Sequence, residues 1–262
     1  MKQLDRDGVK LCYEEAGGGD PPLLFVHGWC CDHSYFALQV GHFKARHRAV
    51  SVDLRGHGAS DKPVMDYRMS AFADDLAWLC RQLGLDRPVV VGHSMGGAIA
   101  LVMAAEFQET VRGVVMIDSP VVTPAAVREA RRPFIAALNG PACREAAASF
   151  ISERLFIPTD DPARKARILA SMLDVPQHVM ASAMARLWDC DTESAAVLCK
   201  QPLLYIGADI ESRTDFALFR ELAPQLLVGQ TVGAGHFNLL EVPDQVNAMI
   251  ETFLAKAFAA VS

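Results

Sequence analysis

The sequence predicts an α/β protein with a mostly parallel, doubly wound sheet and an inserted helical segment. Two observations predict this fold. Short apolar, β-branched runs alternate with longer amphipathic runs towards both ends of the chain, and this alternation is typical of parallel strands joined by helices. Between about 121 and 200 the helical periodicity continues without a convincing strand. We therefore expect 1–120 and 201–262 to form the core and 121–200 to form the insertion.

The individual elements follow from the length and composition of each run. Runs of four to seven apolar and β-branched residues predict buried strands, whereas longer runs with one apolar side predict helices. Strands are expected at 23–26, 48–52, 88–91, 111–117, 202–206 and 226–232. Helices are expected at 67–83, 95–107, 216–222 and 244–255.

Composition and charge exclude several classes of partner. The chain has 262 residues, of which 51% are apolar and 21% are charged, as in a packed globular protein. The formal net charge is −6, and Lys and Arg form no dense block. We therefore expect neither a nucleic acid nor a membrane surface as a partner.

The cellular compartment is predicted from cysteines and from apolar runs. No apolar run reaches the roughly 18 residues that span a bilayer, and the N-terminal residues lack the apolar core of a signal peptide. Of the seven cysteines, Cys30 and Cys31 are adjacent and the other five are scattered, without metal-type spacing. This usage favours reduced cysteine in a cytoplasmic protein without a bound metal.

One hydroxyl lies between glycines where a predicted strand meets a predicted helix. Gly92-His93-Ser94-Met95-Gly96 fits the pattern G-x-S-x-G, and the strand–helix context is what that motif requires. A turn this tight needs small residues two positions before and after the serine. It raises the serine hydroxyl above the carboxyl edge of the sheet. Ser94 is therefore the candidate nucleophile; the alternative is an ordinary N-cap serine.

A serine nucleophile needs a base, and His236 is the best-placed histidine. It follows the flexible stretch Gly233-Ala-Gly235 after the last predicted strand. Such a loop can carry the imidazole back over the edge of the sheet, where it can act on the serine. A thiol nucleophile at Cys30 or Cys31 is a weaker alternative.

Together these motifs resemble the α/β-hydrolase superfamily. Besides Gly-His-Ser-Met-Gly-Gly and the late Gly-His, the chain has His27-Gly28 after its first strand and Asp53-Leu-Arg-Gly-His-Gly-Ala-Ser60 after its second. The resemblance covers essentially the whole chain. It implies a helical cap at 121–200 and an oxyanion hole made by the backbone N–H groups of Trp29 and Met95.

The acid that orients the histidine has more than one candidate. Many members of the superfamily place it after the strand expected at 202–206, where Asp209 is one residue early and Asp215 is late. Other members place the acid after the strand that follows the nucleophile. In this chain Asp118 stands at that position. We favour Asp118 and retain Asp209 and Asp215 as alternatives.

The resemblance implies hydrolysis of a small-molecule acyl substrate, an ester or a lactone, without a cofactor. Superfamily members that act on epoxides or haloalkanes carry an aspartate at the nucleophile position, whereas this chain has Ser94. Two alternatives are a C–C bond hydrolase of aromatic breakdown and a ligand receptor on the same scaffold. The first needs a cation in the pocket, for which Arg186 beside Trp188 is a candidate.

Apolar residues of the insertion and of the motifs are expected around the substrate. Trp29, Tyr35 and Phe237 lie near the motifs. The candidates in the insertion are Phe134, Phe150, Leu155, Phe156, Met172, Met180, Met184, Leu187 and Trp188.

Overall fold

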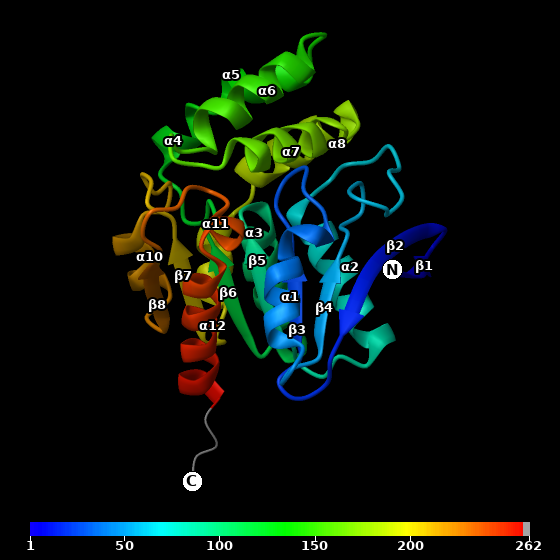
Figure 1. The fold of residues 1–262 in the computed structure, drawn as a ribbon, viewed down its shortest axis with the longest axis vertical. Helices are drawn as coiled ribbons and strands as arrows, with labels where there is room; N and C mark the ends of the chain where they lie inside the picture. The colour runs from blue at the N-terminus through cyan, green and yellow to red at the C-terminus, as the bar shows by residue number, and fades with distance from the viewer. Residues whose placement is uncertain (259–262) are drawn as a thin grey trace.

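The computed structural model of the chain, which describes residues 1–258, contains an eight-stranded sheet with helices on both faces (Figure 1). The strand order is β1-β2-β4-β3-β5-β6-β7-β8, and the strands from β4 to β8 are parallel. The strands are β1 (Lys2–Arg6), β2 (Val9–Ala16), β3 (Leu23–Val26), β4 (Ala49–Val52), β5 (Val89–His93), β6 (Gly113–Ile117), β7 (Leu203–Gly207) and β8 (Leu226–Gln230). The predicted mostly parallel, doubly wound sheet is confirmed.

The central strands are buried on both faces. Every residue of β3, β4, β5 and β6 is buried, which explains why the sequence shows them as continuous apolar runs rather than as an alternating pattern. Their observed ends differ from the predicted ones by one or two residues at most.

An antiparallel hairpin at the N-terminus is absent from our sequence-based prediction. β1 pairs with β2, and β2 pairs with β4, both antiparallel. The turn is Asp7-Gly8, and both residues have positive φ (53° and 80°), as an Asp-Gly hairpin turn requires. Charged residues alternate with apolar ones in this hairpin because one of its faces meets solvent, so it gives no continuous apolar run.

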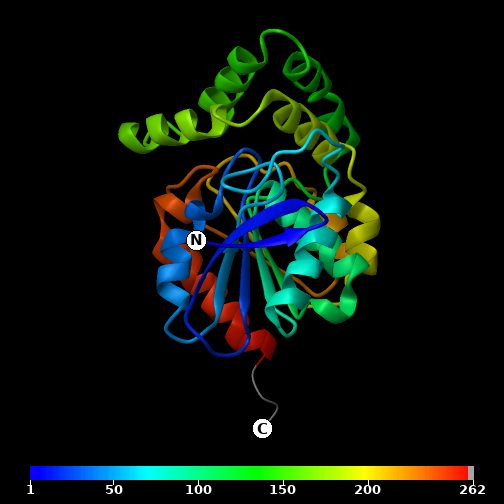
Figure 2. The ribbon, with the colours of Figure 1, turned by 90° about the vertical axis from the view of Figure 1, so that its right-hand side faces the viewer.

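The helices that follow the strands form two layers. Helices α1 and α12 contact each other on one face, whereas α2, α3 and α9 cover the other (Figures 1 and 2). Their bounds are α1 (Ala37–Phe43), α2 (Met69–Leu83), α3 (Met95–Glu106), α9 (Thr192–Leu198), α10 (Phe216–Leu222), α11 (Asn238–Glu241) and α12 (Pro243–Phe258). Two short 3₁₀ helices, η1 (His33–Phe36) and η2 (Gln108–Thr110), lie in the connections.

Five helices form a separate layer beyond the carboxyl ends of the strands, seen at the top of both views (Figures 1 and 2). They are α4 (Ala125–Glu129), α5 (Arg132–Leu138), α6 (Cys143–Arg154), α7 (Pro162–Leu173) and α8 (Gln177–Trp188), and we call them the cap. Helix α9, which lies in the same 121–200 stretch, packs against α3 beside the sheet instead.

The sheet register brings two candidate site residues together. His93, the last residue of β5, pairs with Ile117, the last residue of β6. The next residues along each strand are Ser94 and Asp118. Because β5 and β6 are parallel neighbours, both residues emerge at the same carboxyl edge, below the cap.

Candidate active site

Ser94 occupies the sharp turn between β5 and α3. Its φ of 53° and ψ of −119° lie in a region that side chains rarely adopt, and such a backbone conformation costs roughly 1–3 kcal/mol. Two backbone hydrogen bonds hold it: the Ser94 N–H donates to the Ile117 carbonyl (2.8 Å), and the Gly97 N–H donates to the Ser94 carbonyl (3.0 Å). The residue keeps 9% of its surface exposed, so it is packed but still reachable.

Glycines make this turn sterically feasible. A Cβ on Gly92 would overlap the carbonyl oxygen of Gly96, and a Cβ on Gly96 would overlap the carbonyl oxygen of Val26. A Cβ on Gly28 would lie 3.1 Å from the Cβ of Ser94. The chain therefore passes closely on three sides of the serine, as the spacing in G-x-S-x-G predicts.

His236 and Asp118 form a buried pair at the same edge of the sheet. The Nδ1 atom of His236 lies 2.6 Å from Oδ2 of Asp118, and both side chains are almost wholly buried. Burial alone would raise the pKa of Asp118, but the hydrogen bond with His236 and the positive charge of Arg213 outweigh it and lower that pKa. Asp118 is thus held as a carboxylate, and its Oδ2 accepts a hydrogen bond from the Nδ1–H of the imidazole.

The other two candidate acids make different contacts. Asp209 is exposed, and its Oδ2 accepts the backbone N–H of Gly233 (3.1 Å). Asp215 caps α10 by accepting the N–H groups of Ala217 and Leu218. The structure therefore brings His236 to Asp118, whereas Asp209 contacts a loop and Asp215 caps a helix.

His93 supports the loop that carries His236. Its Nε2 donates to the backbone carbonyl of His236 at 2.8 Å, and the two rings lie 4.7 Å apart. Burial first, and then the charge of His236, lowers the pKa of His93 to about 3, so it is neutral. Sequence reasoning noted His93 beside the motif but gave it no such role.

The two predicted oxyanion donors flank the serine. Met95 is the first residue of α3, so its N–H has no acceptor within the helix and is available to a ligand. Trp29 follows Gly28 and is buried, and its indole Nε1 donates to the Met180 carbonyl in the cap (2.9 Å). This bond ties the loop after β3 to the roof of the site.

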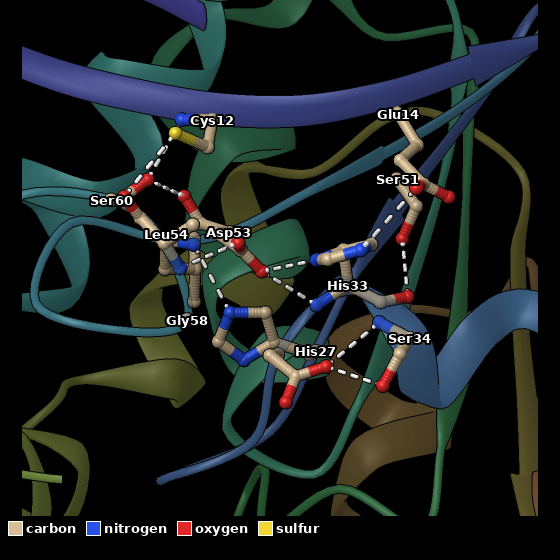
Figure 3. A network of polar contacts seen from close by, with 12 residues as sticks. Cys12, Glu14, His27, His33, Ser34, Ser51, Asp53, Leu54, Gly58 and Ser60 are labelled. Atoms are coloured by element: carbon tan, nitrogen blue, oxygen red, sulfur yellow. Dashed lines mark hydrogen bonds and ion pairs between the residues drawn. The ribbon is translucent and has the colours of Figure 1, made fainter. Parts of the chain in front are cut away.

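The Asp53–Ser60 motif fixes that loop from the other side (Figure 3). The buried Asp53 carboxylate accepts the backbone N–H of His33 (2.7 Å), His33 Nδ1 (2.8 Å) and the N–H of Ala59 (2.8 Å). His27 accepts the N–H of Leu54 at Nε2 (3.0 Å), so its Nδ1 carries the proton and donates to the Gly28 carbonyl (2.8 Å). These bonds connect the ends of β3 and β4 next to Trp29.

The same network occupies the cluster of Asp32, His33 and Asp53, which otherwise has the residue types of a metal site. Their potential ligand atoms all lie within 4.8 Å of one another. The oxygens of Asp53, however, already accept three N–H donors. Burial would raise the pKa of Asp53, but the hydrogen bond from His33 and the charge of His27 hold it below its usual value.

A small, partly open cavity of about 30 Å³ adjoins Ser94 and His236. Such a volume has room for a water molecule or two. Of the expected lining residues, Trp29 and Phe237 border it, but Tyr35 does not. Cap residues at the cavity are Phe150, Leu155, Met172, Met184, Leu187 and Trp188; Phe134, Phe156 and Met180 lie outside it.

The cavity also has a charged wall that sequence reasoning missed. Arg213, on the loop between β7 and α10, lines it. Arg186, the cation considered from the sequence, is part-exposed and pairs instead with Asp66 (2.6 Å) and Asp189 (3.3 Å) outside the cavity. No local sequence signal distinguishes Arg213, because only the path of its loop brings it to the site.

The cysteines near the site are poorly suited to act as nucleophiles. Cys31 lines the cavity, and Cys30 is buried beside it. Burial raises the pKa of both thiols well above their usual value. A thiolate is the reactive form of cysteine, so the thiol alternative loses support.

The fold and this edge of the sheet define a hydrolase class. The family model described as "alpha/beta hydrolase fold" matches residues 21–243, and the chain belongs to that family. No helix within residues 1–258 is both long and apolar enough to cross a membrane.

Individual relatives carry several hydrolase activities. The chain is 36% identical over 138 residues to 2-(acetamidomethylene)succinate hydrolase of Mesorhizobium japonicum, a match that covers 53% of this chain and 48% of that relative. A thermophilic esterase from Thermogutta terrifontis, solved with malate bound, superposes with a TM-score of 0.85 at 24% identity, covering 98% of this chain and 99% of its own. The enol-lactonase from Burkholderia xenovorans gives 0.83 at 24% identity, covering 97% and 100%. At these identities the two structures show the shared fold.

Proposed function

We propose that this protein hydrolyses a carboxylic ester or lactone through Ser94, His236 and Asp118. One observation carries the proposal. Ser94 and His236 border the same cavity, and Nδ1 of His236 lies 2.6 Å from the Asp118 carboxylate. A hydroxyl, an imidazole and a carboxylate in this order are the parts of an acyl-transfer site.

The geometry supports a two-stage reaction. Asp118 fixes the proton of His236 on Nδ1, so that Nε2 is free to take the proton of the Ser94 hydroxyl. The serine oxygen attacks the carbonyl carbon, and the backbone N–H groups of Met95 and Trp29 stabilise the oxyanion. His236 then returns the proton to the leaving oxygen. Water, activated by the same imidazole, releases the acid from the acyl-enzyme.

Each member of this arrangement has a physical consequence. One oxyanion donor is worth about 3 kcal/mol of barrier. Because the N–H of Met95 lies at the amino end of α3, the helix dipole adds to its effect on negative charge. The two backbone hydrogen bonds at Ser94 fix the turn that carries the hydroxyl before the substrate arrives.

Ester and lactone substrates agree with the chemistry of the nucleophile and with the comparisons. Serine forms an acyl-enzyme from a carbonyl substrate. Among proteins of the same fold, one is described as an esterase and one as an enol-lactonase. Both reactions share a tetrahedral intermediate, so one site can serve either substrate.

Replacement of Ser94 tests the proposal. We expect Ser94→Ala to lower kcat on 4-nitrophenyl butyrate by about 10⁴-fold or more, and to abolish labelling by a fluorophosphonate probe. Ser34→Ala, on the exposed first turn of η1, is the matched control and should keep both. Labelling that survives in Ser94→Ala would refute the serine assignment. A wild-type protein that binds 4-nitrophenyl butyrate without hydrolysing it would favour the alternative of a ligand receptor.

A second candidate, a C–C bond hydrolase, gains support from one observation. Such an enzyme needs a cation to hold the carboxylate of a diketone acid, and Arg213 lines the cavity. Turnover of a vinylogous 2-hydroxy-6-oxo dienoic acid, followed by loss of its visible absorbance, tests it. A rate on that acid exceeding the rate on all esters and lactones would favour this candidate over the first.

A further inference from the structure

Arg213 is held firmly at the wall of the cavity by the residues that follow it. Thr214 is buried, and its Oγ1 donates to the Ser119 carbonyl (3.0 Å). The N–H of Asp215 donates to the Val122 carbonyl (3.0 Å). Both acceptors lie on the loop that begins with Asp118, so the arginine is positioned from the candidate site itself.

The guanidinium of Arg213 is largely unpaired within residues 1–258. Its Nη2 reaches the Arg154 carbonyl at 3.4 Å, and it forms no ion pair with a carboxylate of the described chain. The positive charge of Arg213 helps to lower the pKa of Asp118, but the Asp118 carboxylate already forms a hydrogen bond with His236. A guanidinium has five N–H donors, so most of its hydrogen-bonding capacity is available.

A second arginine lies behind the same wall. The Arg131 guanidinium lies 5.6 Å from the ring of Phe150 and 5.5 Å from the ring of Trp188, and both rings line the cavity. Its Nε is buried without a hydrogen-bond partner in the described part of the chain. Burial, followed by the charges of Arg213 and Arg154, lowers the pKa of Arg131.

This arrangement contrasts with other arginines of the protein. Arg6 and Arg55 share Asp75, Arg48 pairs with Glu15, and Arg186 pairs with Asp66. Unpaired charge in apolar surroundings is costly unless something compensates it. Arg131, with its buried Nε, and the part-exposed Arg213 have no carboxylate partner within residues 1–258. Together they offer an anionic ligand two positive charges at one wall of the cavity.

From this geometry we infer that the substrate carries a carboxylate, which Arg213 binds in the cavity with Arg131 as a second positive charge. The inference rests on the proposed function and specifies its substrate class: an ester or lactone with a free carboxylate on its acyl or its alcohol part. Arginine suits this task because its planar fork matches the two oxygens of a carboxylate.

Isosteric substrate pairs test the inference. Mono(4-nitrophenyl) glutarate and 4-nitrophenyl 5-methylhexanoate differ by a carboxylate against an isopropyl group on the acyl side. Carboxymethyl butyrate and isobutyl butyrate differ likewise on the alcohol side. We expect the protein to prefer the anionic member of at least one pair, after subtraction of uncatalysed hydrolysis.

The variants isolate the role of the fork. Arg213→Gln should lower kcat/KM for the preferred anionic ester by about 10–100-fold, the value of a hydrogen-bonded charge pair, and change the neutral partner by less than about twofold. Arg213→Lys should give a kcat/KM for the anionic ester between those of wild type and Arg213→Gln. Arg220→Gln removes the same charge from an exposed position on α10 and should leave both rates unchanged.

The outcomes separate the inference from the proposed function. If the neutral esters are cleaved as well as the anionic ones, and Arg213→Gln changes neither preference, the inference is overturned while Ser94-dependent hydrolysis stands. If no ester is cleaved, calorimetric titration with glutarate still decides the inference. Binding that weakens at least tenfold in Arg213→Gln but not in Arg220→Gln supports it, and equal binding or no binding overturns it.

Discussion

At the scale of single residues, the contact between His236 and Asp118 makes the sharpest prediction. Asp118→Asn preserves shape but removes the charge that holds the imidazole proton on Nδ1. We expect a loss of about a thousandfold or more in kcat. Asp209→Asn, at an exposed carboxylate that accepts one backbone N–H, should cost no more than a few-fold. Steady-state kinetics on 4-nitrophenyl butyrate compares them, and the opposite ranking would transfer the acid role to Asp209.

The sequence predicts single site residues only where the local pattern constrains them. Ser94 lies between glycines that its turn requires, and His236 follows a flexible Gly-Ala-Gly loop. Asp118 and Asp209 both follow strands, so their sequence contexts favour Asp118 without excluding Asp209. The contact with His236 separates them. Arg213 has no local signal, because anchors on Thr214 and Asp215 from a different loop decide where it lies.

At the scale of elements, the β5–α3 turn depends on glycines that a methyl group would block. Gly96→Ala places a Cβ against the Val26 carbonyl oxygen, so the turn must shift. We expect the free energy of unfolding to fall by about 2 kcal/mol or more, together with most of the esterase activity.

Gly41 offers the matched control for that substitution. It is exposed within α1, its φ is not positive, and a Cβ there would meet nothing within 4 Å. Gly41→Ala should therefore raise the free energy of unfolding by about 0.5–1 kcal/mol. Urea titration of both variants measures the contrast; a Gly96→Ala protein as stable as wild type would contradict the steric reading of the turn.

The sequence predicts a core strand or helix best when the element is buried uniformly along its length. The doubly buried strands β3 to β6 appear in the sequence as plain apolar runs. The β1–β2 hairpin has one solvated face, and α1 is short and carries Gly41, so neither gives a comparable run. For the hairpin, Asp7-Gly8 was the available signal, since that pair favours a two-residue turn.

At the scale of the whole molecule, the cavity is too small for the substrates that the site suits. A volume of about 30 Å³ is less than a short ester needs, so side chains around this partly open cavity must rearrange when substrate binds. Sequence patterns indicate the helices of the cap, but they carry no information on how closely it sits over the sheet.

One contact between cap and core involves two carboxyl groups. Asp160, in the cap, accepts the N–H of Ile157 (2.8 Å) and lies 3.7 Å from Arg164. Glu241, in the core, accepts the N–H of Gly235 (2.9 Å), next to His236. Burial, and then the neighbouring Asp160, raises the pKa of Glu241 from 4.5 to about 7.

This shift sets the sign of a pH effect on stability. Between pH 4.5 and 7 the folded protein holds a proton on Glu241 that the unfolded chain releases, so the contribution is complete at low pH and is lost as pH rises towards 7. We expect the free energy of unfolding to fall by about 1 kcal/mol from pH 5 to 7.5 relative to Glu241→Gln, a value reduced because Glu241 is half-exposed. The amide of that variant can still accept the Gly235 N–H. Glu221→Gln, at an exposed position on α10, is the control and should show the same pH dependence of stability as wild type. Urea titrations at several pH values measure the three proteins. If Glu241→Gln also shows the wild-type pH dependence, Glu241 is not the group responsible.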